Sequence, residues 1–240
     1  MDMTPPLKIA DLLEIFRGRQ ERHQAAKFHS LEVGLVRMRE ALNVLQQRAE
    51  EEEFLIASRF NIFSLLGVES NEVATHSRLL GELLSPKGTH AQGALFLEMF
   101  LNLLASLDEE FPAPDPPFIH DQWRVERERH TNFGNIDIVI SSQAAGYLVV
   151  IENKVWSTEQ GRQLERYADW MKIFKAEYPQ QVLIYLTPGG WESDTANQAK
   201  YLPLSYHEDI VSWLESCLPQ IQAQRVTETL RQYLDVIKKL

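Results

Sequence analysis

Alternating apolar and polar positions near the middle of the chain predict a β-strand at residues 135–140. Side chains along a strand point alternately to its two faces, so Asp137 is expected to share one face with Val139 and to lie opposite the isoleucines. The isoleucines of this run are Ile136, Ile138 and Ile140. The strand therefore carries a carboxylate on the face opposite its main apolar stripe.

A second run, residues 147–151, is apolar throughout, which is typical of a central strand covered on both faces. It continues into Glu152, Asn153 and Lys154, where the glutamate and the lysine share a face and the asparagine points away. The connection between the two runs, residues 141–146, is short and polar and ends in glycine, which predicts an antiparallel hairpin. This hairpin would bring the carboxylates of the two strands close together.

The remaining pattern predicts an α/β fold with a mixed central sheet flanked by helices, an N-terminal helical arm and C-terminal helices. A strand, helix, strand passage after the hairpin implies a crossover and a parallel pairing. We expect one globular domain over residues 54–240 with an appended helical arm over residues 1–53. Ser157 and Ser205 are expected to cap helices. Further strands are expected at 123–129 and 181–187, and helices at 71–84, 157–174, 206–218 and 226–240.

The N-terminal arm has apolar residues at helical spacing and charged residues on its other face. Packing or dimerisation is the simpler interpretation, because such stripes are usually hydrophobic faces that need a partner. Contact with nucleic acid through basic residues of the arm is the alternative. These basic residues are Arg17, Arg19, Arg22 and Lys27.

The polar residues at the strand ends favour phosphodiester chemistry. A pair of carboxylates, here Asp137 and Glu152, can hold a hard divalent cation through oxygen ligands. A lysine beside them, Lys154, can stabilise a developing phosphorane charge or orient the attacking water. The arrangement therefore predicts metal-dependent cleavage of a phosphodiester.

With its flanking segments, this pattern resembles the PD-(D/E)XK nuclease superfamily, and within it a bacterial subfamily with four ordered motifs. The proline of the superfamily name is absent, and Ile136 stands before the aspartate. The similarity runs from about residue 54 to the C-terminus. The motifs are E-x-x-x-H-S from Glu72, N-x-D from Asn135, E-N-K from Glu152 and Q-L-x-x-Y from Gln163.

The resemblance implies a restriction-endonuclease-like fold with a magnesium or manganese site. Its metal ligands would be Asp137, Glu152 and the backbone carbonyl of Asn153. Lys154 and Glu72 would complete the catalytic set, although a glutamate at a helix N-terminus also complements the helix dipole. A second group of residues would support the site or contact substrate, namely Gln163, Tyr167, His76 and Ser77.

Structural interpretations stand beside several of these roles. His76, next to an apolar face, is more typical of a structural histidine than of a ligand for a hard cation. Gln163 and Tyr167 are equally compatible with an ordinary helix face, four residues apart. Glu126 and Glu128 on the first strand could approach a metal, but a solvated strand face is the simpler interpretation.

Composition excludes some classes of protein. The 240-residue chain has a single cysteine, which excludes an internal disulfide framework. It shows no signal-peptide pattern and no apolar run long enough for a membrane span, so we expect a cytoplasmic location and no membrane partner. The formal net charge of -10 opposes nucleic-acid binding at long range. Much of the acid lies in residues 50–53 and 108–110, so a local basic rim around the site is still expected.

We therefore expect a Mg²⁺- or Mn²⁺-dependent nuclease that acts on DNA, with phage defence or restriction implied by the resemblance alone. A catalytically weak nucleic-acid-binding or assembly module of the same fold is an alternative that the acidic charge and the long arm favour. An RNA nuclease is another, because no recognition module in the sequence separates RNA from DNA. A homodimer formed through the arm is compatible with all three.

Overall fold

The computed structural model describes residues 9–57, 59–115, 122–156, 161–196 and 198–240. The chain divides into two compact units, Met1–Phe60 and Asn61–Leu240. The first unit contains one long helix, α1 (Ile9–Ile56). The predicted division into an arm over residues 1–53 and a globular domain over residues 54–240 stays a prediction.

The second unit has the mixed α/β architecture that the hydrophobic pattern predicts. Over the described residues, no helix is both long enough and apolar enough to cross a membrane. The strands are β1 (Arg124–Thr131), β2 (Gly134–Ser142), β3 (Tyr147–Asn153), β4 (Gln180–Thr187) and β5 (Leu202–Ser205). The helical segments are α2 (Ile62–Leu66), η1 (Glu72–Ser77), α3 (Arg78–Leu84), α4 (Leu95–Leu107), α5 (Gln163–Ile173), η3 (Tyr206–Ile210), α6 (Val211–Cys217), η4 (Leu218–Gln220) and α7 (Gln224–Ile237).

The sheet has the strand order β1-β2-β3-β4-β5. β1, β2 and β3 pair antiparallel, and β4 and β5 are added in parallel. The predicted hairpin between β2 and β3 and the predicted crossover from β3 through α5 to β4 are both confirmed. β5 was not predicted, because four residues that include a proline carry little strand signal.

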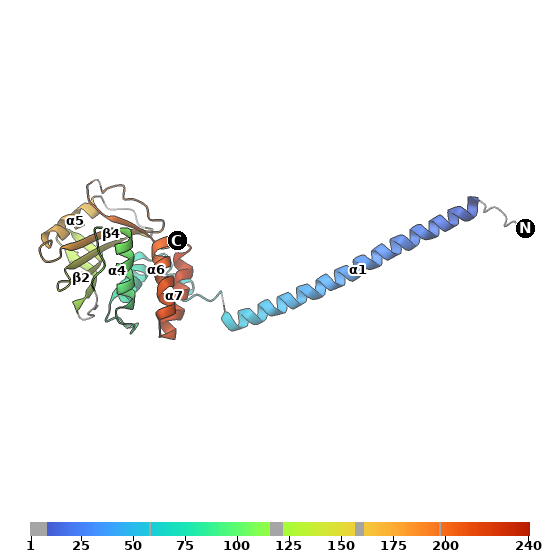
Figure 1. Cartoon of the computed structure of the whole chain (residues 1–240), viewed down its shortest axis with the longest axis horizontal. Coiled ribbons are helices and arrows are strands. Elements are labelled where there is room, and N and C mark those ends of the chain that lie inside the picture. The colour runs from blue at the N-terminus through green and yellow to red at the C-terminus, as the bar shows by residue number, and fades with distance from the viewer. Residues whose placement is uncertain (1–8, 58, 116–121, 157–160, 197) are drawn as a thin grey trace, which may run out of the picture. The chain divides into compact units, whose positions relative to one another are not determined.

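Helices cover both faces of this sheet (Figure 1). α5 lies over one face, where its apolar residues pack on side chains of β2, β3 and β4. α3, α4, α6 and α7 pack over the opposite face and enclose the larger core cluster. β3 lies at the middle of the strand order and is buried along its whole length, which explains its uninterrupted apolar sequence.

The predicted face of Ile136 is wrong. Ile138 and Ile140 pack in the larger core cluster. Ile136 instead packs with Val139 in the cluster under α5. The paired positions of β1 and β2 skip Glu128 and Asp137, and Glu128 has a left-handed φ of 49°. The alternation of faces along β2 is interrupted between Ile136 and Ile138, so these two isoleucines lie on opposite faces of the sheet.

Polar side chains cap the starts of η1 and η3; the cap at Ser205 was predicted, and the one at Asn71 was not. Asn71 accepts a hydrogen bond from the Ala74 amide, and Ser205 accepts one from the Glu208 amide. The first of these helices begins as a π-helical turn, η1, in which the His76 amide reaches back to the Asn71 carbonyl. The expected cap at Ser157 lies outside the described residues.

Truncating Phe100 should test the larger core. Its side chain is 1% exposed, and its ring centroid lies 5.0 Å from that of Trp213. We expect Phe100→Ala to lower the free energy of unfolding by about 3–5 kcal/mol, measured by urea denaturation. Leu107→Ala, on the same helix but 45% exposed, should cost less than about 1 kcal/mol. Equal losses would contradict the assigned packing.

Candidate active site at the ends of the central strands

The hairpin of β2 and β3 places Asp137 beside the end of β3. The two strands pair as far as Ile138 opposite Ile151, so the next residues along them are Asp137 and Glu152. The backbone amide of Asn153 donates a hydrogen bond of 2.7 Å to Asp137 Oδ2. This bond holds one carboxylate against the strand that carries the other.

Lys154 lies among carboxylates. Its Nζ is 2.7 Å from Glu152 Oε1 and 3.9 Å from Glu72 Oε1. Burial disfavours the ammonium form, but the negative charges of these two residues and of Asp137 outweigh it and raise the pKa of Lys154. The site therefore contains a fixed positive charge directly beside its acids.

Glu72 joins this group from η1, far from it in sequence. Its Oε2 accepts a 2.7 Å hydrogen bond from the Val155 amide and a 3.4 Å bond from the Trp156 amide. The carboxylate thus holds the segment after Lys154 as well as contacting the lysine. A role confined to its own helix dipole would require none of these contacts.

The two central acids are held in an environment that favours their neutral forms. Burial raises the pKa of Asp137 to about 6, against the opposing hydrogen bond from Asn153. Burial, and then the charge of Asp137, raise the pKa of Glu152 to about 8. Two buried carboxylates that lie close together repel each other when ionised. Binding a cation between them would therefore be favourable.

The side chain of Asn153 points to the opposite face, as expected, and is fully buried. Its Nδ2 donates to Ser77 Oγ at 2.9 Å, and its Oδ1 accepts from the Tyr206 hydroxyl at 2.9 Å. Ser77 therefore contacts the residue between Glu152 and Lys154, not the acids. These bonds position the strand end from beneath.

His76 has structural partners. Its Nε2 lies 2.7 Å from the Glu69 carbonyl oxygen, so this nitrogen carries the proton, and Nδ1 accepts from the Tyr233 hydroxyl at 3.0 Å. Burial lowers its pKa, although Glu69 and the charge of Glu72 oppose the shift. The ring is a neutral, fully bonded group in the core, so both of its nitrogens are already occupied.

Gln163 and Tyr167 meet on α5, as their spacing predicts. Gln163 Nε2 donates to the Tyr167 hydroxyl at 2.9 Å, and that hydroxyl donates to the carbonyl of Asn135. Asn135 lies two residues before Asp137, so this bond from α5 fixes the backbone of β2 just before the aspartate. This is a positioning contact, and the sequence alone did not indicate it.

Glu128 is a residue for which the sequence left two interpretations open, an approach to the metal or a solvated strand face. It lies on β1 between Arg127 and Arg129, whose partners on β2 are the two neighbours of Asp137, and its charge contributes to the raised pKa of that aspartate. Its Oε1 is buried without a hydrogen-bond partner among the described residues. A solvated strand face, the simpler interpretation from sequence, does not account for this buried oxygen. The alternation of charges on β1 gave no sign of the left-handed φ.

The donor set fits a hard divalent cation in part. Among the residues that the structure describes, no group of three or more His, Cys, Asp or Glu side chains forms a ready metal cluster. In this part of the chain, buried side-chain oxygens of Glu128, Glu152 and Gln163 nevertheless have no hydrogen-bond partner, apart from the ion pair of Glu152 Oε1 with Lys154. Carboxylate and amide oxygens that lack a hydrogen bond and lie around a carboxylate pair are the kind of ligand that Mg²⁺ or Mn²⁺ requires.

Comparison with known proteins gave one match. The family model of the PD-(D/E)XK nuclease superfamily matches residues 60–235 of the chain. No curated protein and no solved structure matches the sequence. The matched region contains the hairpin, η1 and α5, and therefore all the side chains of the site described above.

Asp137→Asn should stabilise the metal-free protein more at pH 8 than at pH 4. Because folding raises the pKa of Asp137 from 3.8 to about 6, its contribution to stability is full below the ordinary pKa and is lost as the pH rises through about 6. Asparagine keeps an oxygen for the Asn153 amide and removes the buried charge. Urea unfolding in chelator should show a difference between the two pH values of about 1–2 kcal/mol.

The control for this experiment is Asp169→Asn on α5, whose side chain is 59% exposed. Its effect should be the same at both pH values. If Asp137→Asn also behaves identically at pH 4 and pH 8, the aspartate is not buried as described.

Tyr167→Phe should loosen the site as well as the fold. It removes the hydroxyl shared by Gln163 and Asn135, so we expect a loss of about 1–2 kcal/mol in unfolding free energy and a smaller rise in melting temperature on adding Mn²⁺. Tyr147→Phe removes a comparable 3.0 Å bond to the Pro112 carbonyl. It should cost similar stability and leave the Mn²⁺ response intact; equal Mn²⁺ responses in both variants would refute the positioning role.

Proposed function

Because this chain belongs to the PD-(D/E)XK nuclease superfamily, we propose that it hydrolyses phosphodiester bonds in DNA with the help of Mg²⁺ or Mn²⁺. The observation that carries the proposal is the convergence of Asp137, Glu152 and Lys154 at the ends of two paired strands. Membership of the superfamily supports the nuclease reaction. The choice of DNA and of the metal belongs to the proposal.

Each side chain has a defined task in this reaction. Asp137, Glu152 and the carbonyl of Asn153 would hold the cation, which when bound would supply Lewis-acid activation of a phosphate oxygen and of water. Lys154 Nζ offers a positive charge to the phosphate as water oxygen bonds to phosphorus and the ester oxygen leaves. Glu72 holds the backbone after the lysine, and so limits how far Nζ can move.

The supporting residues have less direct roles in this proposal. Gln163 and Tyr167 position the strand that carries Asp137, and Ser77 positions the strand that carries Glu152. His76 supports the fold beneath the site. None of these four needs to touch the substrate for the reaction to proceed.

The second candidate is a binding or assembly module with little turnover. The net charge of -10 and the exposed apolar residues of α1 favour it, while the complete set of acid, acid and lysine favours catalysis. RNA stays an alternative substrate. A cytoplasmic role in phage defence or restriction belongs to the same proposal and is supported by the family resemblance alone.

The proposal predicts metal-dependent nicking of plasmid DNA by the purified full chain. Asp137→Ala and Lys154→Ala should each reduce the rate by about 100-fold or more, because each removes a group that acts on the transition-state charge. Activity should vanish in chelator and return with Mg²⁺ or Mn²⁺. Single- and double-stranded DNA and RNA, compared in parallel, identify the substrate.

Asp169→Ala and Lys172→Ala are matched controls, because these residues form an exposed ion pair on α5 and should leave the rate unchanged. Circular dichroism should show that all variants fold. Equal nicking by the wild type and the two site variants would mean contamination or another site. Binding without any cleavage would favour the second candidate.

A further inference from the structure

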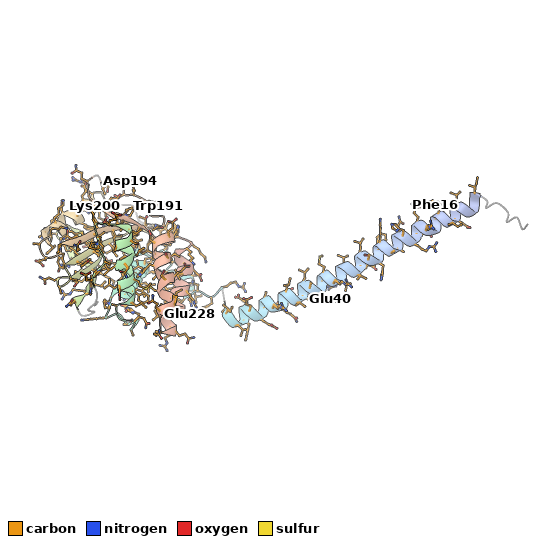
Figure 2. All side chains as sticks on the ribbon, viewed as in Figure 1. Phe16, Glu40, Trp191, Asp194, Lys200 and Glu228 are labelled. Carbon is orange, nitrogen blue, oxygen red and sulfur yellow. The ribbon has the colours of Figure 1, made fainter. Side chains whose placement is uncertain are left out.

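α1 exposes its large apolar side chains along its length, and Figure 2 shows side chains that include Phe16 and Glu40 projecting from it. Six of these side chains between Phe28 and Leu45 form a set that is 57–68% exposed. Nothing in the described part of the first unit covers them, since this unit is built on the one helix. Leaving this much apolar surface in water is unfavourable, so a partner surface is expected. The set consists of Phe28, Leu31, Leu35, Met38, Leu42 and Leu45.

The spacing of these residues identifies the kind of partner. Successive members are separated alternately by three and four residues, and Ala49 extends the pattern to a seventh position. This is a repeat of seven residues, in which Phe28, Leu35, Leu42 and Ala49 occupy a positions and the others occupy d positions. Residues spaced 3.5 apart on average stay in continuous contact with a partner only when the helices supercoil about each other. The partner is therefore another helix.

The charges beside this seam favour a second copy of α1 in the same direction. In a parallel pair, each g residue lies near the e residue five positions later on the other helix. Lys27 would then face Glu32 of the second copy, and Arg48 would face Glu53. An antiparallel pair with the same core layers would instead bring Lys27 close to Arg48, and Glu32 close to Arg39. Its repulsive and attractive pairs would offset each other, whereas those of the parallel pair are all attractive, so charge complementarity favours the parallel arrangement.

We propose that residues 28–49 of α1 form a parallel, in-register, two-stranded coiled coil with a second copy of this chain. The seam has seven core positions and attractive charge pairs near both of its ends. Because Asn61–Leu240 follows the C-terminal end of α1 in the chain, a parallel pair would join both of these units to the same end of the coiled coil. The inference concerns association and does not depend on nuclease activity.

Sedimentation equilibrium of the purified full chain tests the association. We expect a dimer, and expect Leu35→Glu with Leu42→Glu to weaken it by about 100-fold or more, because two charges per helix would be placed in the seam. Val33→Glu with Val44→Glu is the matched control. These valines lie on the same helix, are 38% and 48% exposed, and fall outside the a and d positions.

Disulfide formation tests the orientation. Under mild oxidation, Leu45→Cys should cross-link two copies through the same position, since residue 45 pairs with itself only in a parallel, in-register seam. Val44→Cys, outside the seam, should cross-link far less. Cys217 is buried and burial raises the pKa of its thiol to about 12, so it should not compete.

Several results would overturn the proposal. These are a monomer at tens of micromolar concentration, a trimer or tetramer, equal weakening by the valine and leucine substitutions, or failure of Leu45→Cys to cross-link a dimer. A monomer that still nicks plasmid would remove the coiled coil and keep the proposed function. A dimer with no nuclease activity would keep the coiled coil and remove the proposed function.

Discussion

The arrangement of the site depends on the pairing of β2 with β3. This register decides which side chains meet at the end of the strands, because a slip of one residue would turn Asp137 to the other face. The bond from the Asn153 amide to Asp137 continues the contact beyond the last ladder pair. Two acids that repel each other are thereby held together by backbone geometry, and Lys154 offsets only part of their charge.

The surrounding layers support this hairpin end from both faces of the sheet. On one side, Tyr167 of α5 binds the carbonyl of Asn135. On the other, Ser77 and Tyr206 bind the Asn153 side chain. The motif residues that are not acids or lysine thus act on backbone and strand position, which explains why segments so far apart in the chain contribute to one site.

Sequence alone predicted the parts of this structure that depend on local pattern. The hairpin, the crossover to β4 and the cap at Ser205 follow from alternation, glycine placement and a side-chain oxygen at a helix start. It could not predict the change of face at Ile136 or the buried oxygen of Glu128. Both lie where β1 and β2 leave Glu128 and Asp137 out of their paired positions, and Glu128 has a left-handed backbone angle for which its side chain gives no signal.

The π-helical form of η1 gives this site an unusual sensitivity to chain length. A π turn holds one more residue than the α-helical turn that would otherwise occupy its place, so a single-residue deletion between Glu72 and His76 could restore a regular helix. His76 and Ser77 would stay anchored in the core, while the start of the helix would rotate by about 100°. Such a deletion would leave the fold and the acids of the sheet in place, yet move Glu72 away from Lys154. Length variation in this short segment is therefore a route by which descendants of the chain could lose or alter the site without losing the fold.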